Sequence, residues 1–144
     1  MTSADYDDKE LQARWIGEQR SNVLRYLEAE GVKHRGVASE PVWFIAPIVS
    51  VWTVESVNEP GAVGWWAISG DLPTDYLSGN DAVGARSALA AFAKRWREVS
   101  GYMLRGENHP TLKIGGPDNR RELGDLLLKR AQLIETWVNG DDIW

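Results

Sequence analysis

Two adjacent tryptophans, Trp65 and Trp66, constrain the fold more than any other feature of this chain. Consecutive side chains of a β-strand point to opposite faces of the sheet, and each indole needs about 150–250 Å² of cover. The residues around the pair, 62–69, have the composition of a strand. Both faces of the sheet that contains them are therefore expected to be covered, either by the chain itself or by a partner.

The length and composition are typical of one folded domain. The chain has 144 residues, of which 43% are apolar and 26% are charged, close to the averages of globular proteins. A domain of this size buries about 68–70% of its unfolded surface, which is enough for a core without disulfide or metal staples. We therefore expect a single domain over residues 1–144, with flexible tails at residues 1–6 and 141–144.

Hydrophobic spacing predicts three helices. Apolar residues recur at intervals of three and four in each of them, and a polar residue stands where each helix begins. Asp7 or Asp8 caps the first helix, Asp81 caps the second, and Asn119 begins the third. The predicted helices cover residues 7–30, residues 82–99, and residues from 119 to an end at 139–140.

Between the first two helices the pattern changes to that of β structure. Residues 42–54 are rich in branched and aromatic side chains, and Pro47 among them marks a bulge, an edge or a bend. A turn cluster at residues 56–61 leads into the strand at residues 62–69, so an antiparallel hairpin is the natural connection. Residues 70–80 are predicted to form a loop.

The order helix, hairpin, helix, helix predicts an α+β fold, in which a small antiparallel sheet built on a β-hairpin packs with three helices. Both faces of the first predicted strand carry apolar side chains, the pattern of a strand that is covered on both sides. Three helices can readily cover one face of a small sheet, but they cover both of its faces less easily. We therefore expect a second copy of the chain to cover the other face, which makes the protein a homodimer.

Composition also excludes several classes of function. The chain has no cysteine, and therefore no disulfide, thiolate metal site or cysteine nucleophile. The acidic start MTSADYDDKEL lacks the basic and apolar regions of a signal peptide, and no apolar run approaches the ~20 residues that span a bilayer. A net charge of −5 argues against a nucleic-acid partner. The expectation is a soluble cytoplasmic protein without a cofactor, a metal or a membrane partner.

The segment 70–76 is the first candidate site, because loops on a rigid scaffold often carry function. Asp71 and Asp75 could hold a cation, act as an acid–base pair or bind an arginine, and Thr74 and Tyr76 lie beside them. Turn chemistry accounts for the same residues: Asp71 forms an Asx-turn, Thr74 and Asp75 cap a short helical turn, and Tyr76 packs. The sequence leaves both interpretations open.

Histidines and arginines form the other candidate sites. His34 and His109 lie in separate connectors without metal-ligand spacing, and His109, just before Pro110, is the better catalytic candidate. Arg120 and Arg121 open the third helix, where N–H groups bind anions and the macrodipole disfavours positive charge. They favour a carboxylate or phosphate ligand. Histidines in turns or in solvent, and arginines paired with neighbouring acidic residues, are the alternatives.

The sequence VGWWAISGDLPTDY at residues 63–76 resembles the signature of a family of bacterial proteins of about this length, a domain of unknown function. The segments 41–44 and 88–96 are also similar, so the resemblance covers residues 41–99. It implies a bacterial source and one shared domain. It implies no activity, cofactor or catalytic residue.

No motif in the chain fixes a reaction, since the serine-hydrolase elbow, the dinucleotide fingerprint, the P-loop and the zinc helix are all absent. The first hypothesis is a non-enzymatic protein–protein interaction domain, of accessory or immunity type, that uses the hairpin, Trp65, Trp66 and residues 70–76 as its surface. The alternative is a small enzyme, or a protein that binds a metal or an anionic ligand, with a pocket at Asp71, Asp75 and His109.

Overall fold

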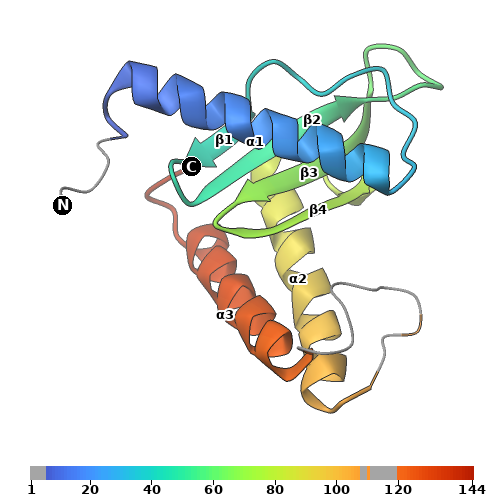
Figure 1. Cartoon of the computed structure of the whole chain (residues 1–144), viewed down its shortest axis with the longest axis vertical. Coiled ribbons are helices and arrows are strands. Elements are labelled where there is room, and N and C mark those ends of the chain that lie inside the picture. The colour runs from blue at the N-terminus through green and yellow to red at the C-terminus, as the bar shows by residue number, and fades with distance from the viewer. Residues whose placement is uncertain (1–5, 108–109, 111–119) are drawn as a thin grey trace. The chain divides into compact units, whose positions relative to one another are not determined.

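The structure, a computed structural model, describes residues 6–107, 110 and 120–144. This part of the chain contains three long helices and one four-stranded antiparallel sheet (Figure 1). The predicted α+β class and the order helix, strands, helix, helix are confirmed. The chain divides into two compact units, Met1–Ala85 and Arg86–Trp144.

The first unit begins with helix α1, Lys9–Ala29. Of the two predicted caps the structure uses Asp8, whose carboxylate accepts hydrogen bonds from the backbone N–H groups of Glu10 and Leu11 at 2.9 and 3.3 Å. This satisfies N–H groups that have no partner within the helix. Gly31 follows the helix with a φ of 71°, a conformation that glycine adopts without strain.

The sheet is a simple meander of β1 (Trp43–Ile45), β2 (Val49–Glu55), β3 (Val63–Gly70) and β4 (Leu72–Ser78), in that spatial order. The predicted hairpin is β2 and β3, which pair antiparallel. Residues 42–54 form two strands, because the chain reverses around Pro47 and the Ile48 N–H donates to the Ile45 carbonyl at 2.7 Å.

The predicted loop at residues 70–80 is wrong, because most of it is strand β4, followed by the 3₁₀ turn η1 (Gly79–Asp81). Glycine, aspartate and proline in this segment read as turn residues. They are tolerated here because β4 is an edge strand and has no neighbour beyond it in the described sheet. The register shifts between Ile68 and Gly70, so Pro73 lies at an irregularity in the ladder.

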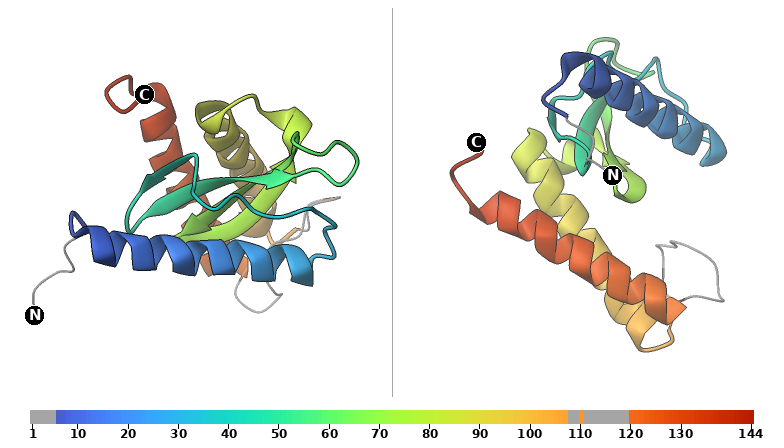
Figure 2. Two further views of the ribbon diagram at one scale, coloured as in Figure 1. Left: turned by 90° about the horizontal axis from the view of Figure 1, so that it is seen from above. Right: turned by 60° about the vertical axis from the view of Figure 1, so that its left-hand side comes forward.

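Helix α1 packs on one face of the sheet (Figures 1 and 2). Its buried residues recur every three or four positions, so they form one stripe. Together with side chains from one face of the strands they form a single cluster, and burial of each large apolar side chain contributes about 1.5–3 kcal/mol. The buried members of this cluster are Trp15, Ile16, Val23, Leu27, Val37, Trp52, Val54 and Ala67. On the opposite face of the sheet, Val49, Val51 and Ile68 are also fully buried.

The second unit is an antiparallel pair of helices, α2 (Ala85–Leu104) and α3 (Arg120–Asn139), visible side by side in Figure 2. Helix α2 begins later than predicted, since Asp81 lies in η1 and does not cap it. It also continues past Gly101. The backbones of α2 and α3 approach closely at Gly124, where an added Cβ would lie 2.9 Å from the Met103 Cβ. Within the described residues, every helix is too short or too polar to span a bilayer.

Candidate functional site

The tryptophan pair lies on β3, as its composition indicates, and the two indoles have different surroundings. Trp65 is half-buried and packs against the cluster beneath α1. Trp66 is only 5% exposed, and its indole N–H donates to the Ala82 carbonyl at 3.3 Å. In the register of the sheet these neighbours point to opposite faces. Packing and a hydrogen bond therefore account for both indoles, and a role for them in binding stays a prediction.

Gly70 and Asp71 form a tight reversal between β3 and β4. The Asp71 N–H donates to the Ile48 carbonyl at 2.9 Å, and the Asp71 side chain is exposed. A Cβ on Gly70 would lie 2.2 Å from that same carbonyl oxygen, so only glycine fits. Backbone contacts therefore fix the turn at Asp71, and both the Asx-turn and a binding role for its side chain stay predictions.

Asp75 and Tyr76 lie on the edge strand β4, and both have structural partners. Asp75 is 1% exposed, and its carboxylate accepts a hydrogen bond from the Tyr76 backbone N–H at 2.8 Å. The Tyr76 ring packs edge-to-face on Tyr26 of α1, with centroids 6.0 Å apart. Pro73 has no N–H to donate, and a proline makes an edge strand a poorer template for another strand. Thr74, which lies between Pro73 and Asp75 in the sequence, is half-buried.

The other predicted residues belong to different segments of the chain. His34 is half-buried in the connector after α1, and Arg121 is exposed on the first turn of α3. Arg120 begins α3, but its side chain is not among the described ones, and His109 lies outside the described residues. In the part of the chain that the structure describes, no three histidine or acidic side chains gather as a metal site would require.

The best-defined surface feature is the hairpin tip, residues 56–62, between β2 and β3. Four hydrogen bonds fix it: Ser56 N–H to the Ala62 carbonyl at 3.0 Å, Ala62 N–H to the Glu59 carbonyl at 3.0 Å, Glu59 N–H to the Ser56 hydroxyl at 3.2 Å, and Gly61 N–H to the Glu55 carboxylate at 3.1 Å. Val57 on the tip and Val63 beside it are each 41% exposed. The tip is therefore a rigid turn that presents apolar side chains to solvent.

A cavity of about 390 Å³ lies beside this tip, between α1, the connector that follows it and the end of the hairpin. Arg20, Arg35 and Glu55 are its charged lining residues. Sequence reasoning missed this cavity, although one signal was available. Arg20 stands four residues after Ile16 and three before Val23, so a charged residue occupies the core-facing stripe of α1.

Sequence reasoning also missed a buried polar chain that links α1 to the sheet. The Trp52 indole N–H donates to the Ser50 hydroxyl at 2.8 Å, and that hydroxyl donates to the Ser69 carbonyl at 2.8 Å. The Ser69 hydroxyl in turn donates to Gln19 Oε1 at 2.6 Å. Because these polar groups are buried and satisfied, they fix the register of α1 on the sheet.

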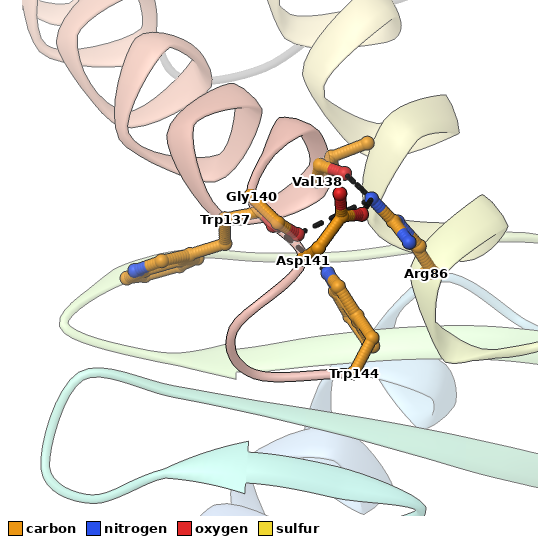
Figure 3. A network of polar contacts seen from close by, with 6 residues as sticks. All are labelled: Arg86, Trp137, Val138, Gly140, Asp141 and Trp144. Carbon is orange, nitrogen blue, oxygen red and sulfur yellow. Dashed lines mark hydrogen bonds and ion pairs between the residues drawn. The ribbon is translucent and has the colours of Figure 1, made fainter.

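In the second unit, the side chain of Arg86 caps the end of α3 (Figure 3). Its guanidinium donates to the carbonyls of Val138 at 2.8 and 2.6 Å and of Gly140 at 3.2 Å, and pairs with Asp141 at 3.1 Å. It also lies 5.5 Å from the ring centroid of Trp144, whose indole donates to the Trp137 carbonyl at 2.9 Å. A cation at a helix C-terminus satisfies carbonyls that lack helical partners. This cluster is therefore structural.

Comparison with protein families places the chain among known sequences. A family model described as Domain of unknown function (DUF4826) matches residues 9–144. The chain belongs to this family. The match extends well beyond residues 41–99, which carry the resemblance in the sequence, and includes α1, the whole sheet, α2 and α3. Comparison with curated proteins and with solved structures finds no significant match. Membership of the DUF4826 family therefore fixes a relationship and leaves function to be argued from the surface.

Proposed function

We propose that this DUF4826 protein is a non-enzymatic interaction domain of the bacterial cytoplasm, an accessory or immunity-type protein that binds a protein partner through the end of its β2–β3 hairpin. The observation that carries the proposal is the hairpin tip. Its four hydrogen bonds hold residues 56–62 in one shape, while Val57 and Val63 remain 41% exposed. A rigid turn loses little entropy when it binds, and exposed apolar side chains gain from being covered.

The proposal has two further parts. We also propose a contribution from segment 70–76, through the exposed turn at Asp71, which lies at the opposite end of β3 from the hairpin tip. We also propose that the protein self-associates as a homodimer, but this no longer follows from an uncovered sheet face, because Val49, Val51 and Ile68 opposite α1 are fully buried within one chain. The alternative is an enzyme or ligand site at Asp71, Asp75 and His109, and no specific observation favours it. Asp71 is exposed, Asp75 is buried, and His109 lies outside the described residues.

Photo-crosslinking tests the partner proposal. A photoreactive amino acid is placed at Val57 or Val63 in the full chain, produced in the organism that encodes it, and irradiated. Leu126 on α3, an apolar residue of similar exposure at 40%, is the matched control position. We expect a discrete heavier product from positions 57 and 63 and none from position 126. Absence of a product from both hairpin positions, or the same product from all three, would overturn the proposal.

A further inference from the structure

The cavity beside the hairpin tip combines two arginines with a rigid frame. It is lined by Arg20 of α1, by the connector residues 35–38, and by the ends of β2 and β3. The connector is fixed to β2 on both sides of the cavity: the Arg35 N–H donates to the Glu55 carbonyl at 3.1 Å, and the Ala38 N–H donates to the Thr53 carbonyl at 3.0 Å. The cavity therefore has a defined shape, which is a condition for selective binding.

Arg20 brings a positive charge to this cavity without a negative partner of its own. Its Nε and Nη2 donate to the carbonyls of Ala38 and Val37 at 3.0 and 2.8 Å, and within the described residues its side chain makes no ion pair. A guanidinium has five N–H donors in a fixed plane, so three remain after these two bonds. The carbonyls hold the group in position but do not neutralise it.

Arg35 is the second cation of the cavity, and its side chain is exposed. The Arg35 side chain makes no hydrogen bond or ion pair with any residue that the structure describes, although the backbone of Arg35 is hydrogen-bonded to Glu55. Glu55 is the one acidic residue among the lining residues, and its carboxylate already accepts the Gly61 N–H at 3.1 Å. Two guanidinium groups and one carboxylate leave the lining with one net positive charge.

We propose that this cavity is a binding site for a single carboxylate group, held between Arg20 and Arg35. Guanidinium groups bind carboxylates through paired, charge-assisted hydrogen bonds. The single net positive charge matches a monoanion, and the Glu55 carboxylate opposes the second charge of a phosphate dianion. The remaining lining residues are uncharged, and the small ones among them, Gly36, Ala38 and Ala62, leave room beside the carboxylate.

Two sources supply this chemistry, a free small carboxylate or a glutamate or aspartate side chain of a protein. The inference goes beyond the proposed interaction surface and does not depend on it. A cavity that binds carboxylate while the hairpin valines crosslink to nothing would leave this inference standing and remove the other.

NMR titration of the full-length, ¹⁵N-labelled protein tests the site. The probes are capped glutamate (N-acetyl-glutamate N-methylamide), the equivalent capped glutamine, acetate and inorganic phosphate. We expect capped glutamate to shift the amide signals of Gly36, Ala38, Gly61 and Ala62 saturably, and capped glutamine to leave them unchanged. Acetate binding as tightly as capped glutamate would identify a free carboxylate as sufficient, whereas weaker acetate binding would identify the side chain in a peptide; both support the site.

Three variants make the test specific. Arg35→Gln removes the exposed cation and is expected to weaken the binding of capped glutamate about fivefold or more. Arg14→Gln, an exposed arginine elsewhere on α1, is the matched control and should bind like the parent. Arg20→Lys keeps the charge but loses the planar fork, and it should also bind more weakly. Thermal melts establish that each variant is folded.

Four results would overturn the inference: no saturable shift with either carboxylate, equal shifts with capped glutamine, tighter binding of phosphate than of capped glutamate, or unchanged affinity in Arg35→Gln.

Discussion

The turn between β3 and β4 depends on a single residue, Gly70, because no side chain fits at this position. A methyl group there would lie 2.2 Å from the Ile48 carbonyl oxygen and 2.9 Å from the Val49 Cα, and both contacts are with backbone that cannot turn aside. We predict that Gly70→Ala lowers the free energy of unfolding by about 2–4 kcal/mol, measured by urea denaturation.

Gly17 provides the matched control for this prediction. It lies in the interior of α1, and an added Cβ would have no atom within 4 Å. Gly17→Ala should therefore stabilise the protein by about 0.5–1 kcal/mol, because alanine is the better helix former. Equal effects of the two substitutions would contradict the geometry of the Gly70 turn.

Residues also show where sequence reasoning succeeds and where it stops. The alternation of Trp65 and Trp66 and the stripe of α1 were readable, because both follow from the fixed periods of strand and helix. Gln19 and Arg20 are polar residues that interrupt this apolar stripe. Their hydrogen-bond partners lie in segments far away in the chain, so these partners could not be predicted from the sequence. Strand β4 was missed for a related reason: its glycine, proline and aspartate are tolerated only because of its place at the sheet edge.

At the scale of elements, α3 depends on a cap that comes from α2. Arg86 supplies it through hydrogen bonds to the carbonyls of Val138 and Gly140. We predict that Arg86→Ala destabilises the second unit by about 1–3 kcal/mol and speeds amide exchange at residues 137–140. Arg121→Ala, an exposed arginine on the first turn of the same helix, should stay within about 0.5 kcal/mol of the parent. Similar exchange rates in both variants would rule out the cap.

A second link between α2 and α3 makes stability depend on pH. Arg97 donates to both oxygens of Glu135 at 2.7 and 2.6 Å, and these bonds lower the pKa of the Glu135 carboxyl below its ordinary value. A carboxyl whose pKa is depressed by folding stabilises the protein above its unfolded pKa, and this contribution is lost as the pH falls through the folded pKa.

We therefore predict that the unfolding midpoint of the parent falls more steeply than that of Glu135→Gln between about pH 5 and pH 3. The difference should be small, because the pair is open to solvent. Glu28→Gln, an exposed glutamate on α1, should follow the parent. Parallel curves for the parent and Glu135→Gln would show that the pair does not contribute.

At the scale of the whole molecule, the proposed homodimer has a direct signature. Light scattering of the purified protein at micromolar concentration should give about twice the 16.1 kDa of one chain. A mass of one chain across the concentration range would show that the protein is a monomer, and it would not bear on the partner surface at the hairpin tip.

Strand β3 directs its two indoles to opposite faces of the sheet, and the whole fold depends on this arrangement. Nuclear Overhauser contacts of the indole protons, assigned with Trp65→Phe and Trp66→Phe, measure this arrangement in solution. We predict contacts from Trp65 to apolar side chains of α1, and contacts from the Trp66 N–H to the region of Ala82 with none to α1. Contacts from both indoles to α1, or an indole that exchanges its N–H as fast as free tryptophan does, would contradict the fold and the surfaces argued from it.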